Sequence, residues 1–323
     1  MIETPLPYRV GALMYSPTLN TSVVKKLTDG SDLTGDLKYL DSLVLCLEDA
    51  ITDSGTEQAE LALCESLAYI TNSRASLPLL FVRPRSPEQL TRLLEKLGTL
   101  TDCLTGFVFP KFDTRNGGQY IEVLTSANAK RAEPFYMMPI IETPSVIHVE
   151  SRLTELREIK EMIGGVKDMV LNVRVGGNDF CGLYGLRRKI CQTIYDIEVV
   201  RDTLTSVINI FARDFVVSAP VWEYFESANK YGWSYGLARE CELDLLNGFI
   251  GKTAIHPTQL KIIRNSIMPD RCDYEDALNI LNWGDDLLGV RKSCNGTRMN
   301  EVSVHTKWAQ KVVALAEIYG VKE

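Results

Sequence analysis

Eight short apolar runs recur through the first 255 residues, and they constrain the fold more than any other feature of the chain. Each run is five to eight residues long, and the stretches between them show the apolar spacing of amphipathic helices. Nearly every run is apolar on both faces, as in the strands of a parallel sheet that helices cover. The predicted strands are 11–16, 42–48, 79–83, 106–111, 135–142, 168–175, 215–219 and 249–255.

Eight strands that alternate with helices over about 250 residues predict an α/β fold, the (β/α)8 or TIM barrel. An open doubly wound sheet is the alternative, but no GxGxxG sequence follows the first run and eight units suit closure. After residue 268 the pattern changes to two helical segments around a polar turn, 291–298. We therefore expect a barrel domain over 1–268 and a C-terminal helical segment over 269–323, which packs on the outside of the barrel, caps the active face or contacts another subunit.

The composition narrows the classes of partner. The chain has 323 residues and a formal net charge of −7, which argues against nucleic acid because a phosphate backbone requires a basic face. No apolar stretch reaches the length of a membrane span, and the N-terminus lacks the pattern of a secretory signal. Eight cysteines without any CxxC indicate reduced thiols, and three histidines do not suggest a multi-histidine metal site. We expect a cytoplasmic protein that acts on a small molecule.

Charged side chains follow five consecutive predicted strands. In a barrel of this type the chemistry lies where the strands end and the next loops begin. A charge at the mouth of an apolar core must be paired, bound to a metal or catalytic. In chain order, these residues are Glu48, Asp49, Arg83, Lys111, Glu142 and Asp179.

Glu142 and Asp179 come from adjacent predicted strands and are candidates to share one cation. Two carboxylates with water as the other ligands suit Mg²⁺, which prefers hard oxygen ligands. The alternative for either carboxylate alone is a salt bridge across the barrel mouth. The glycines beside Asp179, in RVGGNDFCG, let the backbone turn sharply and approach the site.

The two cations of the set have different chemistry. Arg83 suits bidentate recognition of a substrate carboxylate, or it pairs with Glu48 or Asp49. Lys111 is a candidate to bind an anion, to orient a carboxylate, or to form a Schiff base if it is desolvated. We favour the electrostatic role for Lys111.

A second basic cluster, Arg187 and Arg188 in YGLRRKI, follows Asp179 by a few residues. One interpretation is a solvated helix face. The other is a site for a phosphate or another anionic part of the substrate. Cys181 is interpreted as a packing residue, since no histidine lies near it in the sequence to activate the thiol.

Six motifs in order resemble those of the citrate lyase β-subunit-like superfamily, which includes malyl-CoA lyases and HpcH/HpaI-type aldolases. The segments APVWEYF and YGLRRKI further resemble the branch called C–C bond lyases of the TIM-barrel fold. The resemblance covers nearly the whole chain. The six motifs are LCLEDAI, FVRPR, GFVFPKF, PIIETP, GGNDFCG and GKTAIHPTQL.

The resemblance implies a TIM barrel in which Glu142 and Asp179 bind Mg²⁺. It implies that Arg83 binds the carboxylate of a 2-oxo acid. Glu48 and Asp49 would orient the water ligands of the metal.

The C-terminal segment resembles the part of these enzymes that covers the site of a neighbouring subunit. Glu301 stands where many relatives carry an aspartate proposed as acid or base, and the resemblance implies a homo-oligomer, either a trimer or a dimer of trimers. The chain departs from the family where relatives carry an arginine near the first strand, and Arg9 is a candidate replacement. It also lacks the basic residues that follow LEDA in relatives and the strand-two histidine of the HpcH-type aldolases. The use of CoA or phosphate-bearing substrates therefore stays open.

The sequence predicts a Mg²⁺-dependent carbon–carbon lyase of the aldol or Claisen type, which acts on a 2-oxo acid or another carboxylate through a metal-stabilised enolate. Glu301 of a partner chain or a metal-bound water would move the proton. Two alternatives remain. One is a Schiff-base aldolase that uses Lys111, and the other is a non-catalytic barrel in which Arg187 and Arg188 hold an anion.

Overall fold

Eight parallel strands form the centre of the fold in a computed structural model, which describes residues 5–29, 35–73, 75–225, 232–284 and 288–323. The strand order is β7-β6-β5-β4-β3-β2-β1-β8. A parallel bridge between Ala219 and Lys252 joins the two ends, so the sheet closes into a barrel. The strands are β1 (Ala12–Pro17), β2 (Ser42–Cys46), β3 (Leu79–Arg83), β4 (Gly106–Phe109), β5 (Tyr136–Ile141), β6 (Val173–Val175), β7 (Val217–Ser218) and β8 (Lys252–Ala254).

The predicted TIM barrel is confirmed, and the open sheet is wrong because β7 and β8 are joined by hydrogen bonds. The Ile250 N–H donates to the Val217 carbonyl at 2.8 Å, and the Ala219 N–H donates to the Gly251 carbonyl at 3.0 Å. All eight predicted strands are present, but β6, β7 and β8 are shorter than the runs at 168–175, 215–219 and 249–255. Residues Lys167–Met169 form a 3-10 turn instead.

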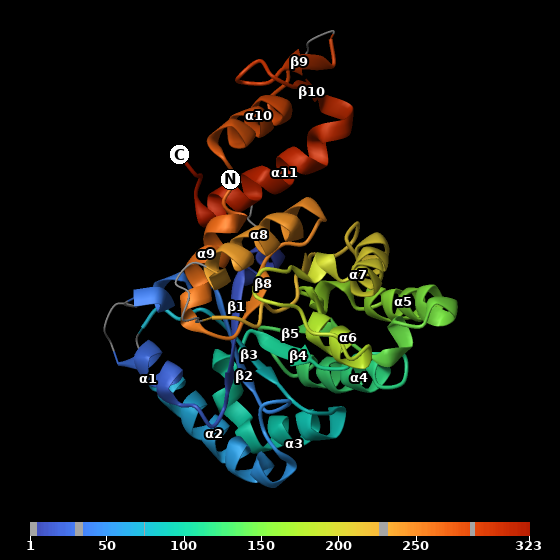
Figure 1. The fold of residues 1–323 in the computed structure, drawn as a ribbon. Coiled ribbons are helices and arrows are strands. Elements are labelled where there is room, and N and C mark those ends of the chain that lie inside the picture. The colour runs from blue at the N-terminus through green and yellow to red at the C-terminus, as the bar shows by residue number, and fades with distance from the viewer. Residues whose placement is uncertain (1–4, 30–34, 74, 226–231, 285–287) are drawn as a thin grey trace.

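Helices surround the barrel, as Figure 1 shows. Their apolar faces pack against the outward side chains of the strands in one continuous core. The helices of this layer are α1 (Ser22–Thr28), α2 (Thr56–Asn72), α3 (Pro87–Leu97), α4 (Gly117–Asn128), α5 (Val149–Gly164), α6 (Gly177–Leu183), α7 (Glu198–Phe211), α8 (Gly232–Leu246) and α9 (Pro257–Ile267).

A second, smaller apolar cluster fills the inside of the barrel. Because side chains alternate between the two faces of a strand, every second residue of each strand points inward. The members of this cluster are Val10, Leu13, Val44, Phe81, Val108, Met138, Ile140 and Leu171. They form the floor on which the polar residues at the strand ends rest.

The C-terminal residues form a helix pair with a small hairpin, which stands off from the barrel in Figure 1. The elements are α10 (Arg271–Leu281), β9 (Val290–Lys292), β10 (Met299–Glu301) and α11 (Val302–Tyr319). The polar turn predicted at 291–298 is thus part of an antiparallel hairpin. The pair has an apolar cluster of its own, and the Tyr319 hydroxyl donates to the Tyr8 carbonyl at 2.6 Å. The boundary at residue 268 stays a prediction.

Two of the eight cysteines correct the expectation of reduced thiols. Cys272 at the start of α10 and Cys294 in the hairpin form a disulfide, with their Cα atoms 6.2 Å apart. The two cysteines are 22 residues apart in the sequence, and they form no motif that would indicate their pairing. The disulfide ties the hairpin to α10.

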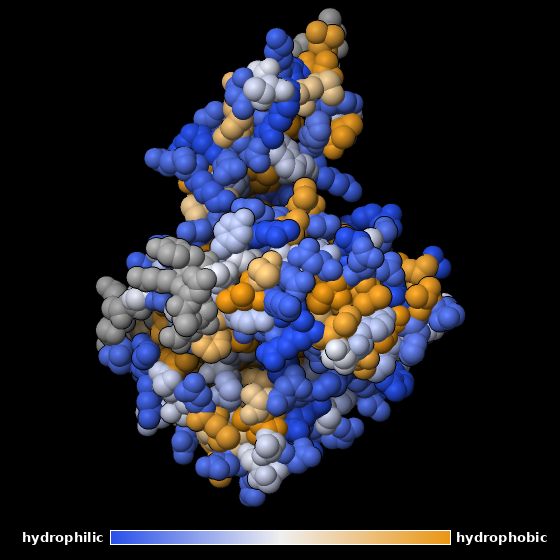
Figure 2. Space-filling view, in the orientation of Figure 1, coloured by the Kyte–Doolittle hydropathy of each residue, from blue (hydrophilic) through white to orange (hydrophobic). Residues whose placement is uncertain are grey.

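The surface is largely hydrophilic, with apolar side chains gathered around α5, α6 and α7 in Figure 2. Leu153, Leu183, Leu186 and Val199 are exposed in this region. No helix among the described residues is both long and apolar enough to cross a membrane.

Gly106 provides a test of how closely the backbones of β4 and β5 approach each other. A Cβ at this first residue of β4 would lie 1.9 Å from the Tyr136 carbonyl oxygen of β5, so backbone would have to move. We expect Gly106→Ala to lower the free energy of unfolding by about 1–3 kcal/mol. Urea denaturation measures the change.

Gly118 in α4 is the matched control, because a Cβ there would meet no atom of the described chain within 4 Å. We expect Gly118→Ala to leave stability unchanged or raise it by up to about 1 kcal/mol. Equal stability of the two variants would contradict the close approach at β4.

Candidate active site

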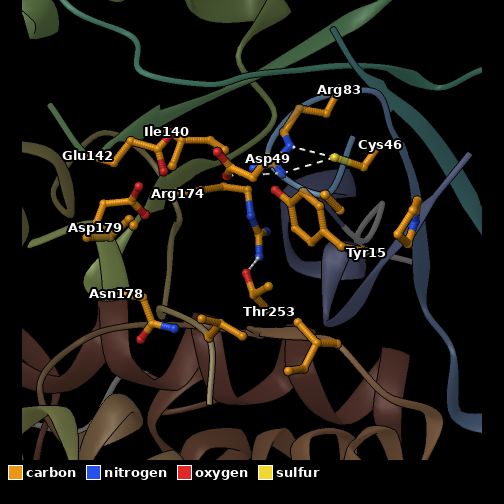
Figure 3. Close-up of a pocket in the computed structure, with 16 residues that line it drawn as sticks. Tyr15, Cys46, Asp49, Arg83, Ile140, Glu142, Arg174, Asn178, Asp179 and Thr253 are labelled. Atoms are coloured by element: carbon orange, nitrogen blue, oxygen red, sulfur yellow. Dashed lines mark hydrogen bonds and ion pairs between the residues drawn. The ribbon is translucent and has the colours of Figure 1, made fainter. Parts of the chain in front are cut away.

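The inward-facing positions turn from apolar to polar toward the C-terminal ends of the strands. On β1, β2 and β3, the residues two positions beyond the apolar floor are Tyr15, Cys46 and Arg83. These side chains line a cavity of about 400 Å³ at the mouth of the barrel, shown in Figure 3. The pleat of the strands thus sets the position of the cavity.

Glu142 and Asp179 converge at one edge of this cavity. Glu142 directly follows β5, and Asp179 lies in the first turn of α6 rather than in the predicted loop. Gly176, between β6 and α6, permits their approach. A Cβ on this glycine would lie 2.4 Å from Glu142 Oε2 and 2.8 Å from Asp179 Oδ2. The two carboxylates therefore meet over the one residue that has no side chain to separate them.

The electrostatics of the pair fit a divalent cation. Burial and the charge of Asp179 raise the pKa of Glu142 to about 8. Burial, followed by the charge of Asp49, raises the pKa of Asp179. Two neighbouring carboxylates that resist ionisation are stabilised by a hard cation such as Mg²⁺, which takes one or two carboxylates and retains water ligands. The residues present thus fit this metal.

Arg83 lies at the centre of a hydrogen-bonded group on the opposite side of the cavity. Its Nη2 is 3.2 Å from Glu48 Oε2 and 3.3 Å from Asp49 Oδ2. Its Nε and Nη2 also donate to Cys46 Sγ, at 3.1 and 3.0 Å. The predicted pairing with Glu48 and Asp49 is therefore present, and it holds the guanidinium at the cavity wall.

Lys111 links this group to Glu142. Its backbone has a φ of 48°, a conformation that side-chain-bearing residues rarely adopt, and its N–H donates to Glu142 Oε1 at 2.8 Å. Its Nζ donates to Glu48 and, at 3.3 Å, to Asp49. Burial alone would lower the pKa of Lys111, but these two carboxylates raise it above its usual range. An ammonium held in this way is poorly suited to Schiff-base chemistry.

A second cavity of about 950 Å³ lies on the other side of the carboxylate pair. It shares Asp49, Glu142, Asn178 and Asp179 with the first cavity, and Lys111 also lines it. The carboxylate pair consequently faces two spaces.

Of the charged residues that line the first cavity, Arg174 alone was not predicted from the sequence. It lies on β6, is 1% exposed, and donates from Nη2 to Thr253 Oγ1 at 2.6 Å. The feature of the sequence that indicates this residue is a single arginine between two valines in an apolar strand, two residues before Gly176. A charge at that position has no place on the outer face of the barrel, which the helices cover.

Arg187 and Arg188 do not line either cavity. Arg188 is 2% exposed, and its Nη1 donates to Glu240 Oε2 at 2.9 Å, so neither the solvated face nor the anion site describes it. Arg187 is exposed and its Nε donates to Glu223 Oε1 at 2.7 Å. Both side chains are paired with carboxylates of the fold, so neither is part of the proposed site.

Two further predicted residues lie apart from the cavity lining. Arg9 lies in the 3-10 turn before β1 and does not line either cavity, so its suggested role stays a prediction. Glu301 precedes α11 in the C-terminal hairpin, where its Oε1 accepts a hydrogen bond from the Ser303 hydroxyl at 2.9 Å. Cys181 is buried in the core between strands and helices, as predicted for a packing residue.

Comparison with known families gives a match over nearly the whole chain. Residues 4–321 match the family described as C–C bond lyase of the TIM-barrel fold. No curated protein matches the sequence.

Solved structures share the fold with little sequence identity. A citrate lyase from Burkholderia xenovorans LB400 has a TM-score of 0.70 at 13% identity, covering 97% of this chain and 93% of its own. The protein CitE from Mycobacterium tuberculosis, solved with magnesium, acetoacetate and coenzyme A, has a TM-score of 0.61 at 16% identity, covering 96% and 99%. The citrate lyase β subunit from M. tuberculosis, complexed with oxaloacetate and magnesium, has a TM-score of 0.50 at 17% identity, covering 80% and 98%. At these identities the likeness shows the fold alone.

Gly176 allows a test of the carboxylate pair. We expect Gly176→Ala to weaken Mg²⁺ binding about 10–100-fold, because the added methyl group would displace Glu142 from Asp179. Calorimetric titration with Mg²⁺ measures the change. Gly182→Ala, in the same helix with no neighbour within 4 Å among the described residues, should bind Mg²⁺ like the unmodified protein. Equal affinities for the two variants would refute the pairing.

Proposed function

Because the chain belongs to the C–C bond lyases of the TIM-barrel fold, we propose that it is a Mg²⁺-dependent enzyme that breaks or forms a carbon–carbon bond in a 2-oxo acid. The convergence of Glu142 and Asp179 at the mouth of the barrel, over Gly176, carries this proposal. The magnesium in two M. tuberculosis structures of the same fold, one with acetoacetate and one with oxaloacetate, supports it.

Glu142 and Asp179 would hold the metal, and water would complete its coordination. When bound, Mg²⁺ supplies Lewis-acid stabilisation of the negative charge that develops on the substrate carbonyl oxygen. Glu48 and Asp49 lie beside this position, where they would accept hydrogen bonds from the water ligands. The N–H of Lys111 fixes the orientation of the Glu142 carboxylate.

Arg83 and Lys111 would neutralise the negative charge of the substrate. The Arg83 guanidinium is buried at the cavity wall, where its attraction for a carboxylate is little screened. The Lys111 side chain is half-exposed and lines the second cavity, so its ammonium suits the more solvated part of a substrate. Both cations are held in place by Glu48 and Asp49 before the substrate arrives, which lowers the cost of organising the site.

Glu301 is proposed as the acid or base, supplied by a second copy of the chain. Within its own chain it belongs to the C-terminal hairpin and is not among the residues that line either cavity. The hairpin stands away from the barrel in Figure 1, where a neighbouring subunit has access to it.

The proposed chemistry can be tested without knowledge of the second substrate. We expect the protein to exchange the methyl protons of pyruvate with deuterium from the solvent in a Mg²⁺-dependent reaction, followed by NMR. Glu142→Gln should lower the exchange rate at least about 100-fold, because it removes one of two charged metal ligands. Gly118→Ala, which lies outside both cavities, is the control and should keep the rate. Exchange that persists in Glu142→Gln or in the presence of EDTA would rule out the metal mechanism.

Mg²⁺ binding should strengthen with pH up to about 8. The raised pKa of Glu142 means that this carboxyl is largely protonated at pH 7 in the metal-free protein, and Mg²⁺ must displace the proton. We expect the apparent affinity to rise about tenfold per pH unit below 8 and to level off above it. The same raised pKa makes the metal-free fold less stable as the pH rises from the usual carboxyl range toward 8, and Mg²⁺ should reverse this loss. Calorimetry between pH 6 and 9 measures the affinity, and a pH-independent affinity would contradict the assignment.

A mixture of inactive variants tests the assignment of Glu301. We expect Glu142→Gln and Glu301→Gln to be inactive in pyruvate exchange when each is purified alone. Co-expression should restore part of the rate, because a mixed oligomer contains sites with an intact metal pair from one chain and Glu301 from another. An active Glu301→Gln protein, or a mixture without any gain, would exclude a catalytic Glu301 from a second subunit.

A further inference from the structure

Arg174 carries a buried charge that the fold does not neutralise. The side chain is 1% exposed, and its hydrogen-bond partners are two uncharged hydroxyl groups, those of Thr253 and Tyr15. Its Nε and Nη1 have no hydrogen-bond partner among the described residues. No carboxylate within the described part of the chain forms an ion pair with it. An isolated buried cation is strongly unfavourable, so such a group indicates a missing anion.

The contrast with Arg83 sharpens this point. Arg83, in the same cavity, is already paired with Glu48 and Asp49 and donates to Cys46. Arg174 has no such group, and its pKa is lowered by burial and by the positive charge of Arg83. Arg83 therefore has counter-charges from the protein before any ligand binds, whereas Arg174 has none among the described residues.

The direction of the side chain places this charge away from the proposed metal. In Figure 3, Arg174 extends from the edge near Glu142 toward Thr253, and its guanidinium lies between Asp179 and Tyr15. Tyr15, which is partly buried, lies beside the guanidinium. Two hydroxyl groups and an arginine thus surround the same end of a cavity of about 400 Å³.

We propose that Arg174, with the hydroxyl groups of Tyr15 and Thr253, binds a second carboxylate of the substrate at the end remote from Glu142 and Asp179. The substrate is then a small 2-oxo diacid, with one end at the metal and the other at Arg174. This inference rests on the proposed function, because the metal defines the first end. It adds to that function a second negative charge on the substrate and names Arg174 as the residue that selects for this charge.

Matched acids that differ only at the remote end provide the test. One pair is 2-oxoglutarate and 2-oxovalerate, and the other is oxaloacetate and 2-oxobutanoate, which covers two chain lengths. We expect the Mg²⁺-loaded protein to bind the diacid of at least one pair about 10–100-fold more tightly than its monoacid, as for a hydrogen bond between buried charges. Calorimetry measures the four affinities.

Arg174→Gln should remove this preference while the affinities for the monoacids and for Mg²⁺ stay within about twofold. Thr253→Val should reduce the preference less, by about threefold, because the arginine remains but loses its hydroxyl anchor. Arg187→Gln, an exposed arginine outside both cavities, is the matched control and should keep the full preference. Equal binding of diacid and monoacid in both pairs, or an unchanged preference in Arg174→Gln, would overturn the proposal.

Thermal unfolding adds a readout that does not require metal or turnover. Arg174→Met should melt at a higher temperature than the unmodified protein, because it replaces an uncompensated buried cation with an apolar side chain of similar length. A diacid should raise the melting temperature of the unmodified protein but not of Arg174→Met. A lower melting temperature for Arg174→Met, together with equal diacid shifts, would show that the arginine is structural.

The two proposals fail separately. If the protein binds no Mg²⁺, but a diacid still raises its melting temperature in an Arg174-dependent way, the proposed metal site is wrong and the proposed anion site stands. If Mg²⁺ binding depends on Glu142 but the protein shows no preference for diacids, the proposed metal site stands and the proposed anion site is wrong.

Discussion

The site depends on the close approach of two carboxylates that repel each other. Glu142 and Asp179 meet where Gly176 has no side chain, and the N–H of Lys111 holds one of them in place. Burial and the charge of Asp179 raise the pKa of Glu142, and burial and the charge of Asp49 raise the pKa of Asp179, so both carboxyl groups resist ionisation in the metal-free protein. A divalent cation would stabilise both ionised carboxylates, and the other polar residues of the cavity lie around this pair.

The barrel makes this arrangement possible because it separates packing from chemistry along each strand. Leu13, Val44 and Phe81 fill the interior below the cavity, and Tyr15, Cys46 and Arg83 follow two residues later on the same faces. The lower layer excludes water and fixes the strands. The upper layer can then carry charges whose positions are determined by backbone hydrogen bonds rather than by flexible loops.

The two arginines of the cavity show how charge is distributed within it. Arg83 is surrounded by Glu48, Asp49 and Cys46, so its position is set before any ligand binds. Arg174 has a hydroxyl partner in Thr253 but no counter-charge among the described residues. Arg83 is therefore preorganised for the first carboxylate of the proposed substrate, whereas the uncompensated charge of Arg174 favours a second carboxylate, and the proposed diacid specificity follows from that difference.

The sequence by itself determined the barrel and the order of the residues at its mouth. Apolar runs of strand length, separated by amphipathic segments, predicted all eight strands, and the charged residues after β2 to β6 marked the end where the cavity lies. Periodicity and strand ends are local properties, so one sequence is enough to read them. The six motifs added the family, which the match over residues 4–321 bears out.

Only the tertiary structure decided which charged side chains face the cavity and which form ion pairs elsewhere in the protein. Arg188 looked like part of an anion site, but it is buried against Glu240, more than fifty residues away in the sequence. Arg174 looked like one residue of an apolar strand, but it supplies the free charge of the cavity. The disulfide between Cys272 and Cys294 was equally hidden. The physical reason is that the state of a charge or a thiol depends on partners brought together by folding, and local sequence does not contain them.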